Sequence, residues 1–133
     1  MGFDLAQNNL ADKAEVGYEF EVTLPDGSGT GAFIKVRGAE SKQVKAYQRK
    51  KFAEYQQKMK IATRKGKEDE ITIEEAEEMA VETAVGRVIS WRNIDENGQP
   101  LPFSKENATR ILAEHAWIRE QVMEASNEIT NFL

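Results

Sequence analysis

The stretch YEFEVTLPDGSGTGAFIKVR, residues 18–37, decides the fold class. Period-two alternation of apolar and polar side chains predicts a half-buried strand over residues 15–24 and a second strand over residues 32–37. The residues between them, 25–29, are rich in Pro, Gly, Asp and Ser and predict a turn. An antiparallel hairpin of this kind is marginal alone in water, so its apolar face needs a cover. The apolar residues of the first strand are Tyr18, Phe20, Val22 and Leu24.

Two helices are predicted to follow the hairpin. Ser41 is a good N-cap for a basic amphipathic helix over residues 42–64. Its expected core stripe is Val44, Tyr47, Phe52, Tyr55, Met59 and Ala62. Thr72 and Glu75 form a capping-box pattern that begins a second helix, which we expect to run to Ile89. Its broad apolar face comprises Ile73, Ala76, Met79, Ala80, Val81, Val85, Val88 and Ile89.

The C-terminal third predicts a turn and further helices. Residues 95–98 form a strong turn signal, and two following prolines favour extended backbone, so that Trp91 and Phe103 are expected to anchor the connection in the core. Ser104 is expected to cap a short helix that breaks near His115. The last segment is expected to be an amphipathic helix of about four turns. Its apolar residues are Ile118, Val122, Ala125, Ile129 and Phe132.

Together these patterns predict an α+β fold. An N-terminal antiparallel β-hairpin is expected to pack on three to four α-helices, with a helical C-terminal half. The length of 133 residues predicts a single domain, residues 1–133. Within it we expect a loose N-terminal arm over residues 1–15, the hairpin over residues 16–38 and the helical part over residues 41–133.

The composition argues against an enzyme. The chain has no cysteine and one histidine, His115, which excludes a disulfide framework and any thiolate metal site or nucleophile. The glutamates from Glu74 to Glu78 are better explained by the helix dipole than by a metal. Glycines at 27, 29 and 31 lie in a turn, not before a helix, and so do not form a phosphate loop. We therefore expect no cofactor and no metal. Neither a signal peptide nor a membrane helix is predicted, so we expect a cytoplasmic protein.

Charge is distributed unevenly along the chain. The net charge is −5, but residues 35–67 carry twelve basic and two acidic side chains, a local balance of +10, and the rest carries −15. Three interpretations of the basic helix remain open: a solvated face, a surface for a protein partner or a second copy, and a nucleic-acid interface. The tyrosines on its apolar stripe and the acidic remainder disfavour nucleic acid. Lys45 and Arg49 are the basic candidates for partner binding.

A resemblance to a known family begins at ISWRNIDENGQPLPFS, residues 89–104. This segment, with ENA at 106–108, WIREQV at 117–122 and the terminal NFL, resembles the tail assembly chaperones of long-tailed (siphovirus-type) bacteriophages. GAFIKVRG at 31–38 is similar to the hairpin of the same proteins. The resemblance implies a non-enzymatic helper in the host cytoplasm, absent from the mature virion. Such helpers bind the tape measure protein and recruit major tail (tube) protein.

The terminal helix is one candidate surface for a helical client, because an amphipathic helix can cover an apolar stripe by helix-in-groove contact. The same face could instead close the core of this domain. Two other functions stay open: a small nucleic-acid-binding regulator that uses residues 42–67, and a structural head–tail connector component. The candidate client-binding residues on this segment are Trp117, Val122, Ile129 and Phe132.

Overall fold

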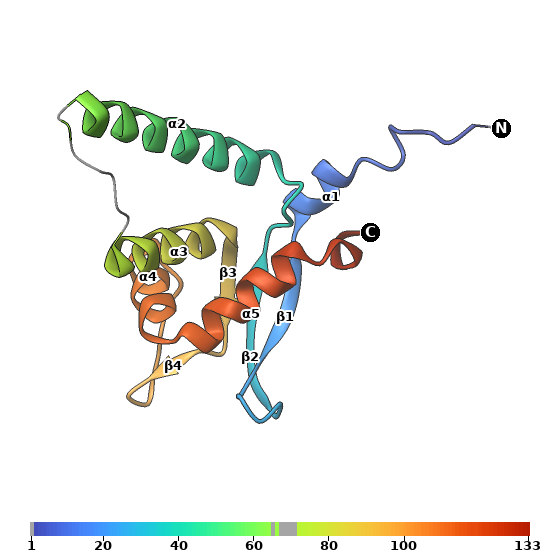
Figure 1. The fold of residues 1–133 in the computed structure, drawn as a ribbon. Coiled ribbons are helices and arrows are strands. Elements are labelled where there is room, and N and C mark those ends of the chain that lie inside the picture. The colour runs from blue at the N-terminus through green and yellow to red at the C-terminus, as the bar shows by residue number, and fades with distance from the viewer. Residues whose placement is uncertain (1, 65, 67–71) are drawn as a thin grey trace.

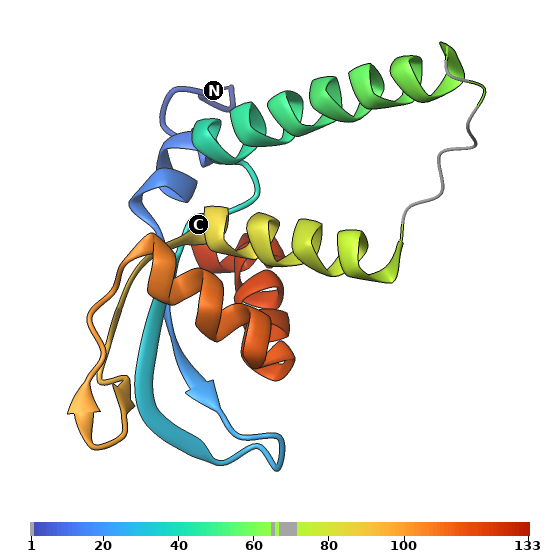
Figure 2. The ribbon, with the colours of Figure 1, turned by 90° about the vertical axis from the view of Figure 1, so that its left-hand side faces the viewer.

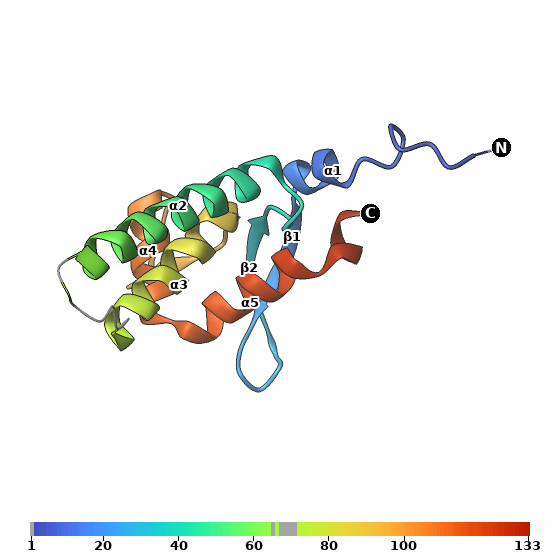
Figure 3. The same ribbon diagram turned by 45° about the horizontal axis from the view of Figure 1, so that its top comes forward.

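The computed structural model describes residues 2–64, 66 and 72–133. Its elements, in chain order, are α1 (Leu10–Val16), β1 (Tyr18–Thr23), β2 (Gly29–Val36), α2 (Lys42–Arg64), α3 (Ile73–Arg87), β3 (Val88–Arg92), β4 (Asp95–Glu96), β5 (Gln99–Pro100), α4 (Lys105–Glu114), α5 (Ala116–Asn127) and the 3₁₀ helix η1 (Ile129–Phe132). The α+β prediction is confirmed: an N-terminal antiparallel hairpin is followed by a helical C-terminal half. Figures 1 and 3 show α3 lying between α2 and α5, with α5 crossing in front of the sheet.

The sheet has three antiparallel strands in the order β1-β2-β3. The hairpin lies where the alternation predicts it. The helix expected to reach Ile89 is wrong at its end, because α3 stops at Arg87 and residues 88–92 pair with β2. Val88 lies opposite Val36, and both are buried. The physical reason is that this segment begins with the β-branched Val88 and Ile89 and hydrogen-bonds to the open edge of β2. A helix at this position would leave the backbone groups of that edge unpaired.

The core lies between this sheet and the helices that cover it. Helix α5 contacts β1 and β2, while α3 and α4 pack beside it (Figure 2). Trp91 and Phe103 meet edge to face with ring centroids 5.1 Å apart, and the Trp91 indole donates to the Leu101 carbonyl. Their predicted anchoring role is confirmed. The buried cluster consists of Val22, Ile34, Val36, Val81, Ala84, Val88, Leu112, Val122 and Phe132.

The expected loose arm is wrong for its second half, because residues 10–16 form α1. The Asn9 side chain caps this helix by accepting from the amides of Ala11 and Asp12. Glu15 then accepts from the Ser41 hydroxyl and the Gln43 amide, at the start of α2. Both hydrogen bonds lower the pKa of Glu15, and the bond from the Gln43 amide has the larger effect. The Glu15 carboxylate therefore connects the N-terminal arm to α2. No local sequence pattern predicts this role.

The predicted four-turn terminal helix is also shorter than expected. α5 ends at Asn127, and Glu128 leads into η1. The 3₁₀ turn carries Phe132 onto Gly38, where a Cβ would lie only 2.9 Å from the ring. Phe132 thereby reaches the core, although the single helix predicted for this segment is interrupted at Glu128.

A buried polar cluster joins the ends of β2, α3 and α5. Arg87, 4% exposed, donates from Nη1 to Ser126 Oγ at 2.8 Å and to Asn127 Oδ1 at 3.0 Å. Ser126 Oγ donates to the Arg37 carbonyl, while the Arg37 amide donates to the Arg87 carbonyl. Burial lowers the pKa of the Arg87 guanidinium. A cation in such a place is tolerated only while its hydrogen bonds are made.

Ser126→Ala should lower the free energy of unfolding by about 1–3 kcal/mol, because it leaves a buried guanidinium donor without its acceptor. Urea unfolding followed by tryptophan fluorescence measures this change. The matched control is Ser90→Ala, since the half-buried Ser90 hydroxyl makes no hydrogen bond within the described residues. Equal losses for the two variants would contradict the role assigned to Ser126.

Candidate functional site

Helices α2 and α3 leave large apolar side chains in solvent. Ile73 is 77% exposed and Met79 is 49% exposed on α3, and Phe52 is 61% exposed on α2. All three were expected to face the core, and that expectation is wrong. The core stripe of α3 runs instead through Val81 and Ala84, and Met79 lies on another side of the helix. Exposed apolar side chains that cluster, rather than scatter, are typical of interaction surfaces.

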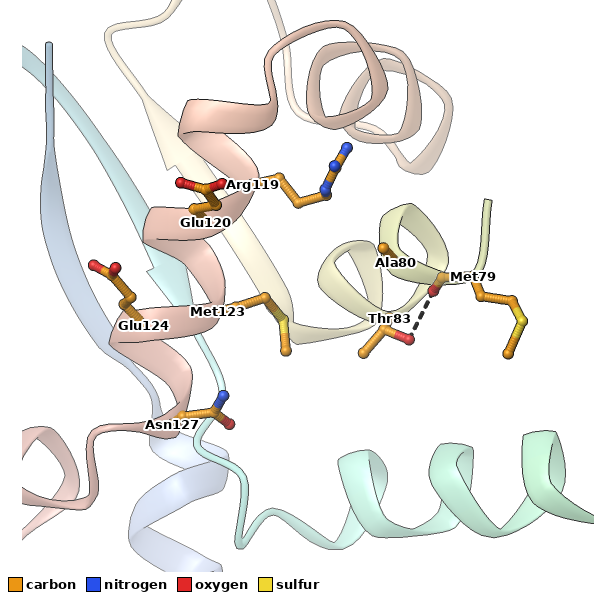
Figure 4. Close-up of a pocket in the computed structure, with 8 residues that line it drawn as sticks. All are labelled: Met79, Ala80, Thr83, Arg119, Glu120, Met123, Glu124 and Asn127. Atoms are coloured by element: carbon orange, nitrogen blue, oxygen red, sulfur yellow. Dashed lines mark hydrogen bonds between the residues drawn. The ribbon is translucent and has the colours of Figure 1, made fainter. Parts of the chain in front are cut away.

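A groove of about 610 Å³ lies between α3 and α5. Figure 4 shows Met123 pointing from α5 toward α3, while Glu120 and Glu124 point away from α3 along the outer side of α5. The lining is mainly apolar and includes Met79, Ala80 and Met123, although Figure 4 shows the Met79 side chain extending away from α5. We call this the α3/α5 groove; it is lined by Met79, Ala80, Thr83, Arg119, Glu120, Met123, Glu124 and Asn127.

The groove can bind apolar surface but carries little that could react. Thr83 Oγ1 donates to the Met79 carbonyl, so this hydroxyl is engaged by its own helix. Among the described residues, no group of three His, Asp or Glu side chains could hold a metal ion. Methionines are unbranched and polarizable, and therefore adapt to partners of varied shape. These properties suit contact with an apolar surface, such as one face of another helix.

Helix α2 is held against α3 by exposed polar contacts. Lys51 Nζ lies 2.8 Å from Glu82 Oε2, and Lys58 Nζ lies 3.0 Å from Glu75 Oε2. The Tyr47 hydroxyl donates to Glu82 at 3.4 Å, and burial raises the pKa of Tyr47. The hydrogen bond from Lys51 lowers the pKa of Glu82, and the same contact raises the pKa of Lys51. We call these contacts the α2–α3 clasp.

The clasp lies beside a smaller hollow of about 200 Å³ to which Tyr47, Tyr55 and Met79 contribute. Both tyrosines are half-buried there. Among the residues of α2, Val44 is buried. Helix α2 therefore depends on the clasp and a thin apolar contact for most of its length.

The residues predicted for partner binding do not form one surface. Val122 and Phe132 belong to the core, which favours the other interpretation of that face, namely that it closes the core of this domain; their part in client binding stays a prediction. Trp117 is half-buried, with its ring 6.2 Å from that of His115. Ile129 is exposed on η1, away from the α5 face it was expected to share.

Lys45 and Arg49 remain exposed on α2, as predicted. Lys45 pairs with Glu40 at 2.9 Å. Sequence reasoning missed the α3/α5 groove because it placed Met79 and Ala80 in the core. The one available signal was that Met79, although not Ala80, lies off the narrow stripe set by Val81 and Ala84.

Comparison with known proteins identifies the origin of the chain. The model of the YdaY prophage protein family matches residues 35–133. The chain belongs to the YdaY prophage protein family. It is therefore a phage-derived protein. The matched part of this YdaY protein begins near the end of β2 and includes α2 to α5, so both walls of the α3/α5 groove lie within the family region. No curated protein and no solved structure matches the chain.

Within the described part of this YdaY protein, no helix is both long enough and apolar enough to cross a membrane. The longest helix, α2, has 23 residues but is dominated by charged and polar side chains.

Acid should loosen α2 in this YdaY protein. The pKa of Glu82 in the folded state lies below its ordinary value of 4.5, so its contribution is present above that pH and is lost as the pH falls through the lowered folded value. Glu82 is half exposed, and the contribution should therefore be at most about 1 kcal/mol. Hydrogen exchange of α2 amides should accelerate as the pH drops below 4.5, after correction for intrinsic rates.

Glu82→Gln is the matched test of this effect. Its α2 amides should already exchange faster at neutral pH and should respond less to acid than those of the unmodified protein. Glu106→Gln, an exposed change on α4 outside the clasp, is the control. Unchanged exchange in Glu82→Gln would show that the clasp does not hold α2.

Proposed function

We propose that this YdaY-family protein is a non-enzymatic tail assembly chaperone that binds the tape measure protein and recruits tail tube subunits. The observation that carries the proposal is the open, methionine-lined α3/α5 groove. Phage origin and the resemblance of residues 85–133 to tail assembly chaperones support it. A chaperone of this kind works in the host cytoplasm and is absent from the mature virion.

The shape of the groove suits one face of a helix. A helix is about 10–12 Å in diameter with its side chains, and it presents apolar anchors at i, i+3, i+4 and i+7. Ala80 on the α3 wall and Met123 on the α5 wall would contact such anchors, and the exposed Met79 would extend the contact along α3. A tape measure protein is long and helical, and its apolar stripes would aggregate if left uncovered. To cover many such stripes in turn, the groove must accept helices of different sequence. Flexible methionine side chains allow this, because they adapt to partners of different shape.

The rim of the groove sets a preference for charge. Glu120 and Glu124 lie on the α5 side, and Arg119 contributes one positive charge. A client helix with lysine or arginine beside its apolar stripe would therefore bind better than an acidic one. Exposed ion pairs add little affinity, so binding remains reversible, as a transient helper requires.

The alternative proposal, a nucleic-acid-binding regulator, would use the basic face of α2. Two observations count against it. Tyr47 and Tyr55 line the hollow against α3 and are not free for base stacking, and Lys51 is engaged with Glu82. Duplex DNA binding that weakens steeply with salt would favour the regulator. A head–tail connector, by contrast, would be found in purified particles.

Co-expression with the tape measure protein of the same phage tests the proposal. The chaperone should raise the soluble fraction of the tape measure protein and co-purify with it. Met79→Glu/Ala80→Glu should abolish both effects, because two buried carboxylates in the groove would lack partners. No gain in solubility with the unmodified protein would contradict the proposal.

The matched control introduces a carboxylate at an exposed apolar residue outside the groove. Leu5, 76% exposed near the N-terminus, serves this purpose as Leu5→Glu. This variant should hold the tape measure protein as well as the unmodified chain does. Circular dichroism of all variants establishes that they fold.

A further inference from the structure

A side of α2 away from the clasp carries an exposed basic and apolar patch, in which Lys45 pairs with Glu40. Lys45, Arg49 and Phe52 follow one another at spacings of four and three, and so share one side of the helix. Together with Gln48 they line a shallow surface hollow. Phe52 lies mostly in solvent within a basic surrounding. We call Lys45, Arg49 and Phe52 the α2 outer patch.

A second groove, of about 600 Å³, lies on the flank of α3 that faces α4 and the start of α5. Val81, Ala113 and Ala116 provide its apolar lining. Carboxylates surround this lining, and one arginine lies among them. We call it the α3/α4 groove; its charged residues are Glu74, Glu77, Glu78, Glu82, Glu114 and Arg119.

The two surfaces are complementary in charge. Helix α2 carries eight basic residues and one acidic residue over 42–64, whereas the groove has five glutamates and one arginine. Glu74, Glu77 and Glu78 make no ion pair with the described residues. The apolar lining with an acidic rim therefore fits an apolar side chain that has basic neighbours, which is the composition of the α2 outer patch.

The patch cannot serve its own groove. Lys51 and Lys58, on a different side of α2, already hold that helix on α3. Lys45, Arg49 and Phe52 line a separate hollow that includes no residue of α3 or α4. Both halves of the complementary pair are thus present on one chain but face different directions, which favours contact between two chains.

We propose that the α2 outer patch of one copy docks into the α3/α4 groove of a second copy. Phe52 packs against the exposed Ala113 and Ala116, above the buried Val81, while Lys45 and Arg49 face the glutamates. A two-fold axis allows the contact to be made twice, which gives a closed dimer. This association goes beyond the proposed chaperone function, because it requires no client and does not use the α3/α5 groove.

Sedimentation velocity of the full chain across a wide concentration range tests this contact. The unmodified protein should dimerise in low salt and dissociate in about 1 M NaCl, where the Debye length is about 3 Å. Lys45→Glu/Arg49→Glu and, separately, Glu77→Lys/Glu78→Lys should each weaken the dimer at least about tenfold, which is about 1.4 kcal/mol.

An equimolar mixture of the two charge-reversed variants is the decisive sample. Each variant repels itself, but the two are complementary to one another, so the mixture should form a heterodimer although neither variant dimerises alone. Restored assembly also shows that both variants are folded. The control is Lys50→Glu/Arg64→Glu, which changes the net charge equally on another side of α2 and should leave the dimer intact.

Several results would overturn the proposal. A protein that stays monomeric at every concentration in low salt has no such contact. A mixture that stays monomeric shows that the two surfaces do not meet. If Lys45→Glu/Arg49→Glu leaves the dimer unchanged but loses tape measure binding or DNA binding, the occupant of the patch is that partner and not a second copy. Because the chaperone test reads client solubility, the two proposals can fail independently.

Discussion

The structure depends on one buried cation, the Arg87 guanidinium. Its hydrogen bonds to Ser126 and Asn127 join the end of α3 to the end of α5, and the Ser126 hydroxyl continues to the Arg37 carbonyl at the end of β2. Among the residues that the structure describes, no carboxylate pairs with this cation, which is stabilised by these neutral acceptors. Three elements distant in sequence must therefore arrive together, and the chain passes from α3 into β3 at this point.

That junction fixes α3 by its C-terminal end and by the Val81 and Ala84 stripe. The other sides of α3 are consequently left for other contacts. One side takes α2 through the clasp, one forms the α3/α5 groove and one forms the α3/α4 groove. Helix α3 thus has three differently charged and differently apolar flanks, as the proposed binding of other chains requires.

Apolar and charged contacts divide the tasks between them. In the proposed function, the apolar α3/α5 groove would provide affinity without strict specificity, because methionine side chains adapt. The charged surfaces provide orientation and respond to salt and pH, because their ion pairs are exposed. Membership of the YdaY prophage family places this arrangement in a phage-derived protein. Self-association and client binding would then use separate flanks of α3.

Local sequence determined the hairpin, the start of α2, the caps at Thr72 and Ser104, the break near His115 and the Trp91–Phe103 anchor, because each depends on residues close in the chain. Tertiary structure alone decided the rest. Val88–Arg92 has apolar residues compatible with either helix or strand, and only the open edge of β2 makes it a strand. Likewise, periodicity predicts that both Met79 and Val122 lie on the apolar face of a helix. Which of them is buried depends on which side of that helix packs against the sheet and the other helices. Burial is a property of what lies opposite a side chain, and a local pattern does not contain that partner.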